Sequence, residues 1–219
     1  MKNKIHQLFG FPIYRASLKK EKYNRNSIIK TILKNYDKSK TRNNWDNSIL
    51  ESSNIHHSLC DDNNKEYAVP DYSYLGPIYI KHTKKYIDQL NLNGNVKFSC
   101  AIVNYTCMTQ NQRMRRHLHV DCDFSGVHYI KFDNKYNDST LFENTLPHAN
   151  YMNKIIPGAL KKFNNSSAMN SYLCRYFKYT TEEDDVIIFP SLLEHSVPEI
   201  KSNKPRITIA FNIKVDKDE

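Results

Sequence analysis

Three potential metal ligands, His117, His119 and Asp121, occupy alternate positions of the segment HLHVD. Successive side chains of an extended strand point to opposite faces, so residues two apart share a face. The three side chains can therefore converge on one point if the segment is extended. His195, which follows the apolar run VIIFP at residues 186–190, offers a fourth ligand from a distant part of the chain. The pattern requires a β-structure that brings two remote strands together.

Two or three ligands close in sequence, with one remote histidine, form the arrangement of a non-haem Fe(II) site that keeps open coordination positions. Two ligand sets are consistent with the residues. His119, Asp121 and His195 would supply two histidines and one carboxylate, whereas His117, His119 and His195 would supply three histidines. The residue left over would then hold a ligand or a metal-bound water from outside the coordination sphere.

The length of 219 residues suits one well-cored domain, so we expect a single domain over residues 1–219. Hydrophobic residues make up 39% of the chain and charged residues 25%, a composition that predicts a folded protein. With only five glycines and no GxGxxG or GxxxxGK[ST] motif, the chain lacks the glycine-rich loops that cradle phosphates.

The net charge of +9 suits an acidic partner such as nucleic acid, but the lysines are scattered and do not follow one element. We therefore interpret the charge as a compositional bias over the whole surface. The five cysteines form no CxxC pair, and neither a secretory leader nor an apolar run of about 20 residues is present. We expect a soluble cytoplasmic protein with reduced thiols and no membrane partner, and we allow for a homodimer.

The predicted elements change in type near residue 94. Residues 1–94 predict a strand at 6–14, restricted to a sheet edge by Pro12, and then amphipathic helices at 22–36 and from Pro77 onward, with a turn-rich loop at 53–74. Residues 95–215 predict strands at 95–105, 125–132, 171–180, 186–190 and 206–215. This order indicates an α+β fold whose β part closes as a sandwich or barrel.

Four motifs together, HxHxD, SGVxYI, FPSxLxHxV and RITIAFN, resemble the superfamily of 2-oxoglutarate and Fe(II)-dependent oxygenases. Within it the chain is similar to an oxygenase family of bacteria and marine phages, which carries an HxH-Pro segment, SGVYY, FPSxLxHxV and RISxxFN. The resemblance covers residues 95–215, and LFGFPIY near the N-terminus resembles that family's opening. The chain departs from the family at Val120, where Pro is usual, and at His128, where Tyr is usual.

The resemblance implies a double-stranded β-helix, a cupin-like jelly roll, over residues 95–215 with supporting helices within 1–94. It also implies Fe(II) as the metal, 2-oxoglutarate and O2 as cosubstrates, and hydroxylation of a prime substrate with release of succinate and CO2. For the third ligand it favours His117, because the family keeps both histidines, whereas coordination chemistry favours Asp121. Both ligand sets therefore remain open.

Arg206 is the predicted anchor of the cosubstrate, because a guanidinium binds the far carboxylate of a dicarboxylate through two charge-assisted hydrogen bonds. Thr208 lies two residues further on the same strand face and offers a hydroxyl. Tyr129 and Tyr105 are candidates for a further hydroxyl, with Asn104 beside Tyr105. We expect the reaction to depend on His119, His195 and Arg206.

The prime substrate is not encoded in these motifs, so a protein side chain, a nucleic acid and a small molecule all remain open. Two other classes of function fit the same residues. One is a cupin-like dioxygenase with three histidine ligands that does not use 2-oxoglutarate. The other is a basic binding module without catalysis.

Overall fold

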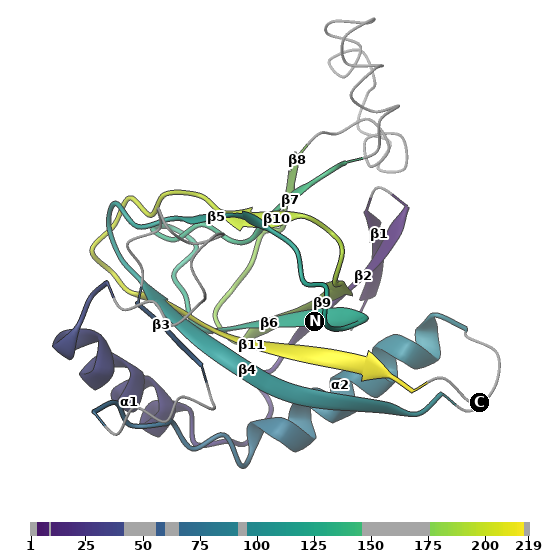
Figure 1. Ribbon diagram of the computed structural model, residues 1–219, viewed down its shortest axis with the longest axis horizontal. Helices are drawn as coiled ribbons and strands as arrows, with labels where there is room; N and C mark the ends of the chain where they lie inside the picture. The colour runs from purple at the N-terminus through teal and green to yellow at the C-terminus, as the bar shows by residue number, and fades with distance from the viewer. Residues whose placement is uncertain are drawn as a thin grey trace, which may run out of the picture.

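The computed structural model describes residues 4–8, 10–41, 56–59, 66–91, 96–145 and 176–216. In this part of the chain two antiparallel β-sheets face each other, and two helices cover the outer face of the larger sheet (Figure 1). Neither of these helices is long and apolar enough to cross a membrane.

The larger sheet has seven strands in the order β1-β2-β9-β6-β11-β4-β3. These strands are β1 Lys4–Leu8, β2 Phe11–Ser17, β3 His56–Leu59, β4 Phe98–Met108, β6 Phe124–Lys131, β9 Asp185–Pro190 and β11 Arg206–Val215. The last strand in the sequence, β11, pairs with both β4 and β6 in the middle of the sheet. Arg206, the first residue of β11, is therefore buried inside the molecule.

The smaller sheet has four strands in the order β5-β10-β7-β8. These are β5 Met114–His117, β10 His195–Val197, β7 Leu141–Glu143 and β8 Tyr176–Lys178. His195 pairs with His117 and Val197 pairs with Met114, so β5 carries one extra residue, a β-bulge. Because of the bulge, Met114 and His117 both face the space between the sheets although they are three residues apart.

The main hydrophobic core lies between the larger sheet and the two helices, α1 Arg25–Lys38 and α2 Leu75–Gln89. Each helix has apolar residues at helical spacing, such as Ile28 and Ile32 on α1, and buries them against β4, β6 and β11. Every second residue of β11, including Ile207 and Ile209, points into this core.

Gly126 of β6 allows the closest packing in this core. A Cβ atom at this position would lie 2.0 Å from Cζ of Phe211, whose ring in turn stacks on Tyr79 at a centroid distance of 4.2 Å. A side chain at residue 126 would displace the aromatic stack, so the glycine of the SGVxYI motif has a packing role.

The structure confirms the predicted double-stranded β-helix and both predicted helices. The expected strand at 6–14 is instead a hairpin, β1 and β2, which turns at Gly10 with φ of 82°. Pro12 does not restrict β2 to an edge, because β2 pairs with β9 only from Tyr14 onward and the missing N–H of Pro12 removes no bond to β9. The predicted loop at 53–74 contains the short strand β3.

Candidate metal and cosubstrate site

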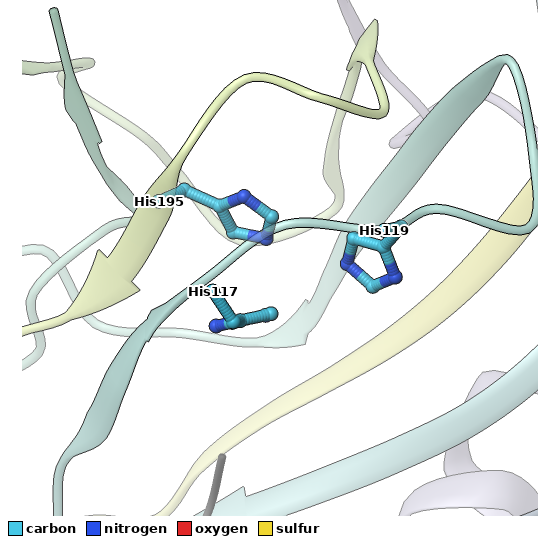
Figure 2. Close-up of side chains that lie close together, drawn as sticks. All are labelled: His117, His119 and His195. Atoms are coloured by element: carbon cyan, nitrogen blue, oxygen red, sulfur yellow. The ribbon is translucent and has the colours of Figure 1, made fainter. Parts of the chain in front are cut away.

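Three histidines form the one group of potential metal ligands found in the described part of the chain. His117, His119 and His195 each offer a ring nitrogen, and these three atoms lie within 4.8 Å of one another. Figure 2 shows the three rings close together, with His195 on β10, His117 at the end of β5 and His119 on the segment that follows β5. His117 ends β5 and is paired with His195, while the backbone N–H of His119 donates to the carbonyl of Ser191 at 2.9 Å. Two remote segments are thus joined at the ligand positions.

Backbone carbonyls determine which ring nitrogens carry the protons. Nδ1 of His117 lies 2.8 Å from the carbonyl oxygen of Arg115, and Nδ1 of His195 lies 2.9 Å from that of Leu193. A carbonyl can only accept, so both Nδ1 atoms donate, and in the neutral ring Nε2 carries the lone pair. This is the tautomer that binds a metal through Nε2.

Burial lowers the pKa of all three histidines. The pKa of His119 falls to about 4 because of burial and the neighbouring His117, and the nearby Asp121 opposes this shift. Burial, His117 and His119 hold the pKa of His195 well below its usual range, and burial outweighs the Arg115 carbonyl in lowering that of His117. The group is therefore neutral at neutral pH, the form that metal binding requires.

Asp121 lies outside this group. The strand β5 ends at His117, and Asp121 is exposed in the bend that follows. The alternation that would align residues 117, 119 and 121 does not continue, because it applies only while the chain is extended. Of the two ligand sets, the structure assembles the three histidines.

The histidines share a pocket with the inner face of the larger sheet. Besides the three histidines, its walls comprise His57, Asn104, Thr106, Met114, Val127, Thr140, Val197, Arg206, Thr208 and Ala210. A wider hollow around Lys131, Glu182 and Lys204 contains none of the three histidines. The pocket at the histidines is therefore the candidate site.

Apart from the histidines, Arg206 is the one basic residue among the described residues that line the pocket. Its exposed fraction is 1%. Its Nε donates to the carbonyl of Asp138 at 2.9 Å, and its Nη1 lies 3.4 Å from Oγ1 of Thr208. Its guanidinium carbon lies 5.3 Å from the ring centroid of Tyr129. No carboxylate of a described residue lies within ion-pair distance of Arg206. A buried cation without a counterion is costly, so the pocket is prepared for an anion.

The other predicted cosubstrate residues have different positions. Thr208 lines the pocket, and its hydroxyl shares a hydrogen bond of 2.7 Å with that of Thr106. The hydroxyl of Tyr129 donates to Oγ1 of Thr140 at 2.7 Å, so Tyr129 supports the pocket from behind and presents its ring to Arg206.

Tyr105 is not brought to the pocket. Its hydroxyl lies 2.8 Å from Nδ2 of Asn35 and 3.1 Å from Nε2 of His56, on the helix side of the larger sheet. Its neighbours Asn104 and Thr106 face the pocket instead, because side chains alternate along β4. The pairing of Thr208 with Thr106 fixes this alternation.

Several pocket residues were not singled out from the sequence: His57, Thr106, Met114 and Thr140. Thr106 could have been predicted, because it lies two residues after Asn104 and so shares its face of the strand β4. His57 had none, because the four residues HHSL contain one apolar side chain and show no period of two.

Comparison with known proteins shows which proteins the chain is similar to. A family model described as "Putative 2OG-Fe(II) oxygenase" matches residues 104–212, which include all three histidines and Arg206. No curated protein matches the sequence.

Two solved structures share the fold. A Pseudomonas putida prolyl-4-hydroxylase is 10% identical with a TM-score of 0.52, covering 92% of this chain and 91% of its own. A Trichoplax adhaerens prolyl hydroxylase, solved in complex with a hypoxia inducible factor oxygen degradation domain peptide fragment, is 11% identical with a TM-score of 0.52, covering 92% and 83%. These two structures show the fold, and the family model shows that residues 104–212 are similar to 2OG-Fe(II) oxygenases.

Proposed function

We propose that His117, His119 and His195 hold Fe(II), that Arg206 and Thr208 hold 2-oxoglutarate, and that the enzyme hydroxylates a prime substrate. One observation carries this proposal: three clustered neutral histidines and a buried arginine without a carboxylate partner line the same pocket. The first group suits a metal cation and the second suits an anion.

The residues fit the metal and the cosubstrate. Imidazole nitrogens suit iron, and three protein ligands leave coordination positions open. Because all three are neutral, the ligand set leaves the metal's positive charge uncompensated, which favours a dicarboxylate. When bound, Fe(II) and 2-oxoglutarate together activate O2 for oxidation of a substrate C–H bond, with release of succinate and CO2.

The protein's own contribution is to orient the cosubstrate. The carbonyl of Asp138 and the ring of Tyr129 fix the plane of the Arg206 guanidinium. Its remaining N–H groups can then bind a carboxylate without first reorganising. Met114 and Val197 add apolar wall to the pocket and limit the access of water.

An anaerobic titration with Fe(II) and 2-oxoglutarate tests the proposal, because the chelate has a weak visible charge-transfer absorbance and needs no prime substrate. We expect His117→Ala to lose the band and Asp121→Ala to keep it. We expect Arg206→Ala to require far more 2-oxoglutarate. Loss of the band in Asp121→Ala, with retention in His117→Ala, would replace the three-histidine set by the carboxylate set.

A three-histidine dioxygenase that does not use 2-oxoglutarate is the second candidate, favoured by the exclusion of Asp121 from the ligand group. Bound iron without the band, and full activity in Arg206→Ala, would support it. A cytoplasmic location and a homodimer remain predictions from the sequence.

A further inference from the structure

Asn104 is a buried amide for which the fold supplies no partner. It is 4% exposed, it lines the pocket, and its side chain forms no hydrogen bond with any part of the chain that the structure describes. Buried polar groups are nearly always hydrogen-bonded, and leaving one unpaired is costly. The protein therefore carries an amide whose hydrogen-bonding capacity is available to a bound molecule.

A second buried asparagine shows what the fold does when the amide is structural. Asn35 on α1 is 1% exposed, and its side chain donates to the carbonyl of Ala68 and to the hydroxyl of Tyr105, each at 2.8 Å. Its Oδ1 accepts from the backbone N–H of Ala68 at 3.1 Å. The contrast marks Asn104 as a residue directed at a ligand.

Asn104 lies beside the predicted cosubstrate site, one strand away from it. It pairs with Ala210 of β11, four residues beyond Arg206, or about 13 Å along the strand at ~3.3 Å per residue. His57 of β3, fully buried, pairs with Thr106 and faces the same pocket. Asn104 and His57 thus add a polar wall on the side of the pocket toward the sheet edge.

The chemistry of this wall points to an amide. The side-chain amide of Asn104 can donate and accept at once, and this matches the C=O and N–H of a peptide bond. The neighbouring wall is apolar, with Met114, Val127 and Val197. Resting on the proposed function, we propose that Asn104, with His57, binds an amide group of a peptide prime substrate and so determines substrate class.

A nucleobase fits this wall less well. Enzymes that act on a flipped base hold it by stacking between aromatic or apolar side chains, whereas no Phe, Tyr or Trp is among the described residues that line the pocket. A phosphate would compete for Arg206, the one cation of the lining outside the histidines. Peptides are therefore favoured over nucleic acids.

Asn104→Leu is the informative variant, because it keeps the branched shape of the side chain and removes both the donor and the acceptor. Asn35→Leu is the matched control in the helix-side core. Thermal unfolding establishes that Asn104→Leu is folded, and the anaerobic Fe(II) and 2-oxoglutarate titration establishes that its metal and cosubstrate sites are intact. A native protein without the charge-transfer band would refute the proposed function itself, before any substrate is added.

The probes are a mixture of N-acetylated, C-amidated tripeptides with every standard residue in the middle position, and mixed-sequence single-stranded DNA and RNA oligonucleotides. Mass spectrometry detects one added oxygen atom, and peptide-induced change of the charge-transfer band measures binding without turnover. We expect the native enzyme to oxygenate peptides. We expect Asn104→Leu to need about 10-fold more peptide for half-saturation, the effect of one lost buried hydrogen bond, with its 2-oxoglutarate titration unchanged.

Three results would overturn the inference while leaving the proposed function in place. Oxygenation of oligonucleotides but not peptides would assign the other substrate class. Oxygenation of neither, with the band intact, would exclude peptide amides as the recognised group. A weaker 2-oxoglutarate titration in Asn104→Leu, with peptide half-saturation unchanged, would make Asn104 a cosubstrate residue.

Discussion

The two faces of β4 and β11 differ in how their polar groups are satisfied. On the helix side, Tyr105 is hydrogen-bonded to Asn35 and His56. On the pocket side, the side chain of Asn104 has no hydrogen bond and Arg206 has no ion pair with any described residue. Around Tyr105 the helix-side face is therefore hydrogen-bonded within the protein, whereas the pocket side leaves hydrogen-bonding capacity unused. Unused capacity in a buried position identifies binding groups better than residue type does.

The buried histidines follow the same division. On the helix side, His128 has Nδ1 2.8 Å from the hydroxyl of Tyr79 and Nε2 3.4 Å from Asp184, so side chains of the protein occupy both nitrogens. On the pocket side, the ring of His195 forms one hydrogen bond with the described residues, from Nδ1 to a backbone carbonyl. Both nitrogens of His128 are thus hydrogen-bonded, whereas Nε2 of His195 has no hydrogen bond to any described residue.

The largest expected effect tests the packing of the helix side. Gly126→Ala places a methyl group 2.0 Å from the Phe211 ring, so we expect a loss of at least about 3 kcal/mol in the free energy of unfolding, measured by denaturant titration. The control is Gly76→Ala in α2, where nothing lies within 4 Å of the added Cβ and a helix favours alanine. Equal stability of both variants would contradict the tight contact.

Replacing one histidine on each face by alanine should separate effects on iron binding from effects on stability. We expect His195→Ala to lose bound iron and detectable activity while the metal-free protein keeps its fold. We expect His128→Ala to retain iron binding but to lose about 2–3 kcal/mol of stability, because a cavity and unpaired partners remain. Iron analysis and unfolding of the same samples provide the check, and iron loss in both variants would remove the distinction.

Arg206→Met tests whether the buried charge of Arg206 binds 2-oxoglutarate. We expect the half-saturating 2-oxoglutarate concentration to rise about 100-fold, since truncating one partner of a buried charge pair costs ~2–5 kcal/mol. The free energy of unfolding without cosubstrate should stay the same or rise, because no protein carboxylate loses its partner. Marked destabilisation would instead make Arg206 a structural residue.

The two buried asparagines allow a comparison at a single residue type. Asn35→Leu should lose about 2 kcal/mol of stability, because Tyr105 and the backbone of Ala68 lose their partners. Asn104→Leu should be neutral or stabilising in the ligand-free protein, since it removes an unpaired amide. Urea unfolding of both variants measures the difference, and similar losses would show that Asn104 is satisfied within the fold.

The smallest effect concerns pH and the helix-side His82. Burial lowers its pKa from 6.5 to about 4, so between these values the unfolded chain binds a proton that the folded chain does not. This stability is fully present above pH 6.5 and is lost as the pH falls toward 4. Replacing His82 by Phe should remove about 1 kcal/mol from the loss measured between about pH 7 and pH 5.5 in metal-free protein. An unchanged pH dependence would show that folding does not lower the pKa of His82.

The fold and the centre of the site could be predicted because the relevant signals are local or chemical. Alternation within RIT placed Arg206 and Thr208 on one strand face. In HLHVD the residue types carried the signal, because β5 ends at His117 and the alternation does not continue. The sequence alone did not decide between the three-histidine set and the set with Asp121, because that choice depends on the residue at which β5 ends.

The rest depended on information that the sequence does not contain locally. Tyr105 was a candidate because its hydroxyl suits the cosubstrate, but a shift of one residue in strand alternation turns it to the helices. His57 is a pocket residue only because β3 pairs with β4, a tertiary contact between strands that are about 40 residues apart. Register and long-range pairing therefore limited the prediction.

The bulge in β5 has a consequence for how the chain tolerates change. Met114 and His117 reach the same interior space only because β5 contains one residue more than β10 between their partners. Substitution of the exposed Arg115 would keep that count, whereas deleting it would remove the extra residue and turn His117 outward. This segment should therefore tolerate substitutions better than insertions or deletions. We expect homologous sequences to align here without gaps.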